Sequence, residues 1–118
     1  MNSAEIQNYL IPVAILLFFG WRLFRFRQVK GEMMSYLESG AIVVDVRTAG
    51  EYAQGHAANS LNIPLNELAN RLNEISKNKM VVLCCASGAR SGMALALLKK
   101  NGFQQVINAG PWTNTLVG

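Results

Sequence analysis

The sequence contains few of the residues that build metal sites or disulfide frameworks. Among its 118 residues there is one histidine, and the only two cysteines, Cys84 and Cys85, are adjacent. Adjacent cysteines lack the ligand spacing of zinc sites and do not form a disulfide framework. We therefore expect no resident metal and no disulfide-stabilised secreted domain. A working thiolate is also kept reduced more easily in the cytoplasm.

Net charge is small outside one short segment. The net charge is +4, and Arg22, Arg25, Arg27 and Lys30 form a cluster. Residues 31–118 hold seven Lys and Arg against six Asp and Glu, which leaves +1. The basic balance therefore belongs to the cluster and not to a broad face that would bind nucleic acid. With 51% hydrophobic residues, the chain fits one folded domain and not a disordered one.

The N-terminal region carries the longest stretch without charge. Residues 9–21 are thirteen residues with no charged side chain, and residues 6–24 extend this to nineteen. A membrane-spanning helix needs about twenty apolar residues. Trp21 and Arg22 stand near the end of the stretch, where aromatic and snorkelling basic side chains suit a membrane interface. Because thirteen uncharged residues are few, an amphipathic or buried helix is the alternative interpretation.

This pattern divides the chain at its basic cluster. We expect residues 1–27 to form a hydrophobic helix, a single-pass transmembrane anchor with a basic flank, which contacts membrane lipid through residues 6–24. A secretory signal fits poorly, because the residues before the apolar run include Glu5 and neither Lys nor Arg. Since positive charge follows the run, residues 28–118 are expected to form a domain on the cytoplasmic side.

The remainder alternates between strand-like and helix-like patterns. Such alternation predicts an α/β fold, doubly wound, with a parallel sheet and helices on both faces. Short apolar or β-branched runs predict strands at 41–46, 80–84 and 105–108. Capping signals and apolar spacing predict helices at 48–54, at 92–100 and from Pro64 onward, the last with Leu65, Leu68, Leu72 and Ile75 on one face.

Cys85 lies between the strand at 80–84 and the helix at 92–100. A cysteine at this junction meets unpaired backbone N–H groups and the partial positive charge of a helix N-terminus. Such a position favours the thiolate, which is the reactive form. Ligands of parallel α/β folds also bind at the carboxyl ends of strands. Cys85 is therefore the candidate catalytic nucleophile.

Several motifs around Cys85 resemble, in order and spacing, those of rhodanese-like domains. The resemblance covers roughly residues 28–118. A cysteine and an arginine at one spacing occur often by chance, but the ordered set of motifs is specific. The motifs are Asp45-Val46-Arg47, Glu51-Tyr52, Gly55-His56, Asn62-Ile63-Pro64-Leu65, Cys85-x4-Arg90-Ser91, Gly102-Phe103, Val106 and Asn108-Ala109-Gly110.

The resemblance implies a five-stranded, mostly parallel sheet and a sulfurtransferase activity. A small sulfane donor such as thiosulfate would leave a persulfide on Cys85, and cyanide or a small or protein thiol would accept the sulfur. We expect no cofactor besides this covalent persulfide. A curled loop can aim successive N–H groups at an anion, and a glycine lets its backbone bend. The expected persulfide- and substrate-binding loop comprises Ala86, Ser87, Gly88, Ala89, Arg90 and Ser91.

Other residues of the motifs are expected to be structural. The resemblance implies that Asp45 and Arg47 mainly form a buried, hydrogen-bonded scaffold near the site. His56 lies in a motif that implies a structural turn, and persulfide chemistry needs no base once the thiolate exists. Cys84 is expected in the core, because neighbouring strand residues point to opposite faces. Ser87 and Ser91 are candidates to donate hydrogen bonds to the sulfur, and the alternative for Ser91 is that it caps the following helix.

Two further functions remain possible from the sequence. One is a non-enzymatic rhodanese-like module for sulfur sensing or docking at a membrane. The other is a phosphatase or arsenate reductase, which resembles this chain but uses a loop one residue longer, so the four residues between Cys85 and Arg90 argue against it. Ala86 and Ala89 occupy loop positions that are often basic in thiosulfate-using members. This departure leaves the identity of the donor open.

Overall fold

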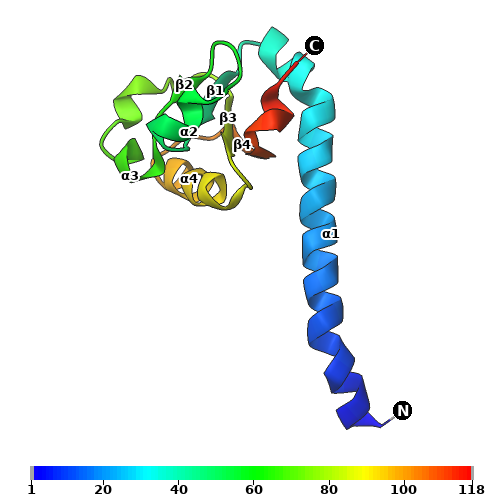
Figure 1. The fold of residues 1–118 in the computed structure, drawn as a ribbon. Coiled ribbons are helices and arrows are strands. Elements are labelled where there is room, and N and C mark those ends of the chain that lie inside the picture. The colour runs from blue at the N-terminus through cyan, green and yellow to red at the C-terminus, as the bar shows by residue number, and fades with distance from the viewer. Residues whose placement is uncertain (1, 118) are drawn as a thin grey trace.

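The computed structural model describes residues 2–117, in which one long helix stands beside a small α/β domain (Figure 1). The N-terminal part of this helix extends beyond the domain. The helices are α1 (Ser3–Glu38), α2 (Ala49–Ala53), α3 (Leu65–Leu68) and α4 (Ala89–Lys100), with short 3₁₀ turns η1 (Leu72–Glu74) and η2 (Trp112–Thr115). The strands are β1 (Ile42–Asp45), β2 (Leu61–Asn62), β3 (Val81–Cys85) and β4 (Val106–Pro111).

The sheet is parallel throughout, with strand order β2-β1-β3-β4. The predicted α/β class is confirmed, but residues 2–117 form four strands and not the five that the resemblance implied. The strand β2 was not predicted, because two residues are too few to show an alternating pattern. Its Asn62 side chain donates hydrogen bonds to the carbonyl groups of Asp45 and Arg47, at 3.0 and 2.9 Å.

An irregularity in β4 lies next to the carboxyl end of β3. Leu83 pairs with Asn108, but Cys84 pairs with Gly110, so Ala109 is an extra residue in β4. Such a bulge bends a strand and turns its side chains. The Asn108 side chain accepts a hydrogen bond from the Gly110 N–H at 2.9 Å, which fixes this bend.

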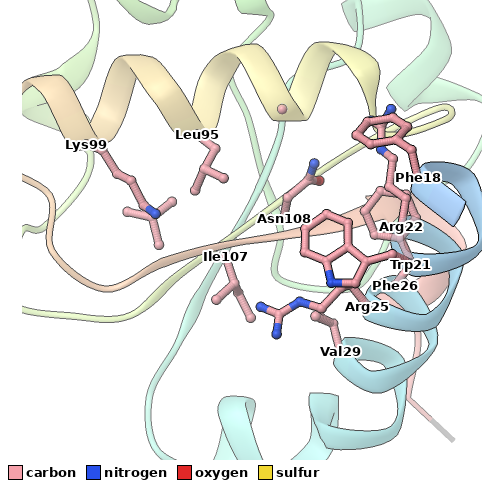
Figure 2. A pocket seen from close by; sticks show the side chains of 12 residues that line it. Phe18, Trp21, Arg22, Arg25, Phe26, Val29, Leu95, Lys99, Ile107 and Asn108 are labelled. Atoms are coloured by element: carbon pink, nitrogen blue, oxygen red, sulfur yellow. The ribbon is translucent and has the colours of Figure 1, made fainter. Parts of the chain in front are cut away.

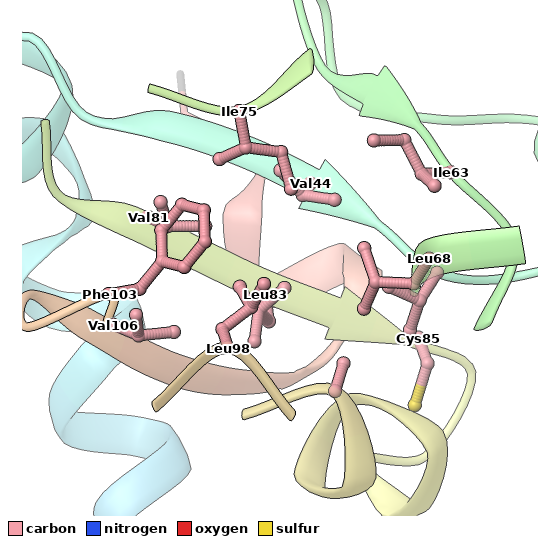
Figure 3. Close-up of a cluster of buried hydrophobic side chains, with 12 residues drawn as sticks. Val44, Ile63, Leu68, Ile75, Val81, Leu83, Cys85, Leu98, Phe103 and Val106 are labelled. Atoms are coloured by element: carbon pink, nitrogen blue, oxygen red, sulfur yellow. The ribbon is translucent and has the colours of Figure 1, made fainter. Parts of the chain in front are cut away.

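Two apolar clusters cover the two faces of the sheet. The first lies under α3 and α4 and reaches Cys85 at its edge (Figure 3); it comprises Val44, Val46, Ile63, Leu68, Ile75, Val81, Leu83, Cys85, Ala94, Leu98, Phe103 and Val106. The second lies toward α1 and comprises Val29, Met33, Val43, Val82, Cys84 and Ala109. Helical segments thus cover both faces, as predicted.

The predicted helices differ from the observed ones mainly at their ends. The Thr48 capping box is present, with Glu51 as its acidic partner, and opens α2. The helix predicted at 92–100 begins earlier, at Ala89. The helix predicted from Pro64 is broken into α3 and η1, because the chain closes i→i+3 turns at Asn70 and Arg71. The four residues predicted on its inner face are still buried in the first cluster or packed against it.

The helix α1 passes residue 27 without a break and ends at Glu38; Gly40, whose φ of +91° suits glycine, follows two residues later. Its Val29 and Met33 are buried against the sheet. Burying a methionine side chain stabilises a fold by about 1.5–3 kcal/mol. The apolar part of α1 is exposed, and the helix is long and apolar enough to cross a membrane.

Candidate active site

Cys85 is the last residue of β3, and its exposed fraction is 0%. The Gly88 N–H donates a hydrogen bond to Cys85 Sγ at 2.9 Å, and the Ser91 hydroxyl lies 3.3 Å from the same sulfur. Gly88 precedes α4 with a φ of +102°, a left-handed conformation that favours glycine. The turn between β3 and α4 therefore folds donors of the loop around the sulfur.

Ser91 is shared between the sulfur and Asn108. Its hydroxyl oxygen lies 2.6 Å from Asn108 Oδ1, which also accepts from the Gly110 N–H. The Asn108 amide nitrogen donates to the Gly88 carbonyl at 3.2 Å, so the orientation of the amide is set from both sides. Because a hydroxyl has one proton, Ser91 can donate to Asn108 while Cys85 is a thiol and to the sulfur once it is a thiolate.

The pKa of Cys85 reflects two opposing effects. Burial raises the pKa of this thiol, but hydrogen bonds from the Ser91 hydroxyl and from the N–H groups of Ser91, Gly88 and Ser87 outweigh burial and hold the pKa below its ordinary value. A thiolate is the nucleophilic form of cysteine. The hydrogen-bond donors of the loop therefore stabilise an anion on the sulfur.

Cys84 lies on the opposite face of the sheet, as the alternation of strand side chains predicted. It belongs to the apolar cluster beneath α1. Burial first, and then the charge of Asp45, raise the pKa of the Cys84 thiol far above its ordinary range. Cys84 is therefore a neutral core residue in the folded chain.

The charge of Arg90 is matched by a neighbouring carboxylate. Its guanidinium forms a bidentate ion pair with Glu51, at 2.6 Å for Nη1–Oε1 and 3.0 Å for Nη2–Oε2. The hydrogen bond from Arg90 is the largest cause that lowers the pKa of Glu51 to about 2, followed by the bond from the Thr48 N–H. The pair ties the first turn of α4 to α2, 39 residues away in the sequence.

Asp45 and Arg47 form a buried pair that supports α2. Arg47 Nη2 lies 2.7 Å from Asp45 Oδ2, and both side chains are almost fully buried. The same guanidinium donates to the carbonyl groups of Gly55 at 2.7 Å and Glu51 at 3.3 Å, and its face lies over the Trp112 ring. These contacts place Glu51 where its carboxylate meets Arg90. Neither Asp45 nor Arg47 forms a hydrogen bond with Cys85 Sγ.

His56 lies apart from the cysteine. Its exposed ring stacks on Tyr52, with 3.7 Å between ring centroids, and its Nδ1 is 2.7 Å from the Tyr52 carbonyl oxygen. These contacts belong to the turn after α2. Among residues 2–117, no three His, Cys, Asp or Glu side chains gather in a way that could hold a metal ion.

The helix α1 packs directly on the backbone around the loop. A Cβ built on Gly88 would lie 2.7 Å from Phe26 Cζ, and one on Gly110 would lie 2.7 Å from Phe26 Cδ2. Both glycines have positive φ, at +102° and +77°. Only residues without a side chain can therefore accept the Phe26 ring at these two positions.

Two hollows flank this contact. One, of about 320 Å³, lies between α1, α4 and β4 and is lined by residues that include Trp21, Arg25, Lys99 and Asn108 (Figure 2). The other, of about 270 Å³, opens between α1 and the cysteine loop; its lining residues are Phe19, Arg22, Leu23, Phe26, Ser87 and Pro111.

Comparison with known proteins places this geometry in a family. The sequence profile named Rhodanese-like domain matches residues 29–110. The chain belongs to the rhodanese-like domain family. Solved structures agree: a rhodanese-like domain protein from Staphylococcus aureus is 31% identical, with a TM-score of 0.65 over 73% of this chain and 86% of that one. A rhodanese with anions from Escherichia coli is 34% identical, with a TM-score of 0.60 over 64% of this chain and 91% of that one.

Curated relatives of this rhodanese-like domain include sulfurtransferases. A sulfurtransferase from Allochromatium vinosum is 42% identical over 67 residues, which are 57% of this chain and 63% of that protein. The thiosulfate sulfurtransferase PspE of Escherichia coli strain K12 is 38% identical over 69 residues, which are 57% of this chain and 66% of that protein. The chain thus spans less than two thirds of the length of these curated relatives.

Within the rhodanese-like domain, the structure gathers Cys85, Gly88 and Ser91 around one sulfur, while Ala86 and Ala89 are exposed on the outside of the loop. Sequence reasoning missed three partners of the loop. Glu51 was interpreted only as a helix cap, although it stands in a family motif with Tyr52. Asn108 also stands in a motif, but no local pattern signalled its bond to Ser91. Phe26 lies outside the motifs altogether.

Proposed function

We propose that this chain is a sulfurtransferase that carries sulfane sulfur as a persulfide on Cys85. The observation that supports the proposal most is the loop around Cys85 Sγ, which donates hydrogen bonds to the sulfur and lowers the pKa of its thiol. A persulfide bears its charge on the terminal sulfur, and donors around the loop can stabilise that anion as well. Sulfurtransferases among the relatives support the same chemistry.

The reaction has two displacement steps. In the first, the Cys85 thiolate attacks the outer sulfur of a sulfane donor such as thiosulfate; the sulfur–sulfur bond breaks, and sulfite leaves with the bonding electron pair. The product is Cys85–S–S⁻. In the second, cyanide or a thiolate attacks the terminal sulfur, and the Cys85 thiolate departs. Both steps are nucleophilic displacements at sulfur, so neither requires a redox cofactor.

The surroundings of the sulfur impose a condition on both steps. Cys85 is fully covered in this structure, so a donor reaches its sulfur only after neighbouring side chains move. Ser91 would then follow the charge, since its hydroxyl lies within reach of both the sulfur and Asn108 Oδ1. Arg90, held by Glu51, would brace the first turn of α4 and keep the loop in place during transfer.

We further propose that α1 anchors the enzyme in a membrane, with the catalytic domain facing the cytoplasm. The exposed apolar part of α1 and the basic cluster that follows it support this orientation. On this proposal the chain contacts lipid through residues 6–24. A full chain that stays soluble without detergent or lipid would contradict the anchor.

Intact-mass measurement tests the sulfurtransferase proposal. The full chain in non-ionic detergent is incubated with thiosulfate or mercaptopyruvate and then weighed. We expect a gain of one sulfur atom in the wild type and in Cys84→Ala, and no gain in Cys85→Ser. Circular dichroism of Cys85→Ser checks that the fold persists. No adduct with any donor would favour the sensing or docking module, and an adduct on Cys85→Ser would reject Cys85 as the carrier.

A further inference from the structure

The cysteine loop lacks a free cation of its own. Ala86 and Ala89 are apolar, and the charge of Arg90 is matched by the Glu51 carboxylate in a bidentate pair. Sulfane donors such as thiosulfate are anions, so a donor that approaches this loop alone would meet hydrogen-bond donors but no unmatched positive charge. A cation must come from elsewhere if the site is to attract such a donor electrostatically.

The helix α1 brings a cation to the loop. Arg22 lines the hollow of about 270 Å³ between α1 and the loop, and Ser87 lines its other side. Ser87 is two residues from Cys85, and its N–H is among the groups that stabilise the Cys85 thiolate. The hollow therefore leads from the Arg22 side chain to the outer rim of the loop that holds the sulfur.

Arg22 is available for an anion. Among residues 2–117, no carboxylate lies within ion-pair distance of Arg22, in contrast to Arg47, Arg71 and Arg90. Its guanidinium carbon lies 5.4 Å from the centroid of the Phe26 ring, and that ring is wedged against Gly88 and Gly110. Arg22 is thus positioned relative to the loop by the same aromatic side chain that fastens the helix there.

We propose that Arg22 is the anion-binding residue for the sulfur donor, and that α1 thereby completes an active site that the α/β domain alone leaves without a free cation. The assignment to a sulfur donor rests on the proposed sulfurtransferase function. The ligand is a small anion, a sulfane donor with one or more negative oxygens, held in the hollow between Arg22 and Ser87. Arg22 replaces the positive charge that the alanines do not supply.

Charge-selective alkylation of Cys85 tests the anion site without a sulfur donor. Iodoacetate and iodoacetamide are nearly equal in size and differ in charge, so the ratio of their rates cancels the effect of how well the sulfur is covered. Both rates are measured on the full chain in non-ionic detergent, with tandem mass spectrometry to assign the modified cysteine. An attraction between unit charges about 4 Å apart changes a rate by about fivefold at the dielectric of water, and by more at a lower dielectric.

We expect Arg22→Gln to lower the iodoacetate-to-iodoacetamide ratio by about tenfold at low salt. Arg27→Gln removes the same charge five residues along α1, at a residue that lines neither hollow, and should leave the ratio within about twofold. Added salt should lower the ratio in the wild type and not in Arg22→Gln. An equal ratio in wild type and Arg22→Gln, or an equal loss in Arg27→Gln, would overturn the inference.

Persulfide loading separates this inference from the proposed function. If thiosulfate loads Cys85 and Arg22→Gln raises the thiosulfate concentration needed for half-maximal loading, both stand. If loading occurs equally in both proteins, the Arg22 assignment fails and the sulfurtransferase stands. If no donor loads Cys85 while the alkylation ratio still depends on Arg22, the assignment to a sulfur donor fails.

Discussion

Cys84 and Cys85 are neighbours on one strand, and the two faces of the sheet give them opposite properties. Both are buried, with exposed fractions of 1% and 0%. Cys84 lies among apolar side chains under α1, and the pKa of its thiol is raised. Cys85 lies at the edge of the other cluster, beside the loop, and the pKa of its thiol is lowered.

The comparison shows that burial alone does not decide the reactivity of a thiol. Desolvation disfavours the thiolate of both cysteines. Around Cys85 the Ser91 hydroxyl and the N–H groups of the loop more than compensate, whereas the Asp45 carboxylate raises the pKa of Cys84 further. Two adjacent residues at the end of β3 thus provide a structural thiol on one face of the sheet and a nucleophile on the other.

The largest expected effect is the difference in alkylation between the two cysteines. In the folded chain at neutral pH, iodoacetamide should modify Cys85 at least about a hundredfold faster than Cys84, because only Cys85 has a stabilised thiolate. Variants Cys84→Ala and Cys85→Ser let each thiol be followed alone by mass spectrometry.

The pH dependence of the alkylation rate should also differ between Cys85 and Cys84. Since the pKa of Cys85 is lowered, its alkylation rate should rise with pH and become constant below the pH at which an ordinary thiol levels off. Since the pKa of Cys84 is raised, its rate should still be rising there. Comparable rates for the two thiols in the folded chain would remove the contrast between the two faces.

Breaking the Glu51–Arg90 pair should slow sulfur transfer at Cys85 and leave the apolar cluster around Cys84 intact. Glu51→Gln removes the charge that holds Arg90, so the loop is no longer fixed and the transfer rate should fall about tenfold. Because the pKa of Glu51 is about 2, the wild-type pair should persist throughout the ordinary range of assay pH.

Glu74→Gln is the matched control for this variant. It breaks a similar pair, with 2.7 Å between Arg71 Nε and Glu74 Oε2, on an exposed segment away from the loop. The rate of cyanide-dependent thiocyanate formation reports both variants. Equal effects of the two substitutions would show that the loop does not depend on Glu51.

A smaller effect is expected from Ser91→Ala, which removes the hydroxyl 3.3 Å from Cys85 Sγ. The pKa of Cys85 should rise, because its thiolate loses the hydrogen bond from the Ser91 hydroxyl, which lowers this pKa more than any other contact does. A typical intramolecular hydrogen bond contributes about 1 kcal/mol, which corresponds to roughly a fivefold slower alkylation at neutral pH. The Ser87 hydroxyl makes no hydrogen bond to Cys85 Sγ within residues 2–117. Ser87→Ala should therefore change the alkylation rate less. A full pH–rate profile distinguishes a shifted pKa from a misfolded loop.

The parts of the site that lie close together in sequence were predictable. The apolar run before Cys85, the glycine at 88 and the helical pattern after Ser91 place a cysteine at a strand–helix junction by local rules alone. The alternation of side chains along β3 likewise predicted that Cys84 would face away from the loop. These conclusions depend on steric and hydrogen-bonding preferences within a few residues.

The contacts that cross the fold were not predictable in this way. Glu51 meets Arg90 across 39 residues, and Asn108 meets Ser91 across 17, through the packing of α2 and β4 beside α4. A bulge in β4 turns Asn108 toward the loop, and no residue pattern in β4 announced it. The length of α1 was also not predictable from local pattern, because the helix continues through residues 28–38 past the basic cluster, and Gly40 follows its end.

The unbroken course of α1 has a mechanical consequence. Phe26 is wedged between two glycines at the cysteine loop, and the same helix leads without a break toward its apolar end. Each residue of a helix adds 1.5 Å of rise and about 100° of turn. With that end in a bilayer, as proposed, the length of helix between the apolar stretch and Phe26 sets the height of the Cys85 sulfur above the lipid. It also sets the direction in which the cysteine loop faces. A single residue inserted between the apolar stretch and Phe26 would lift the catalytic domain slightly and rotate it by more than a quarter turn, presenting the loop to a different sector of the membrane surface.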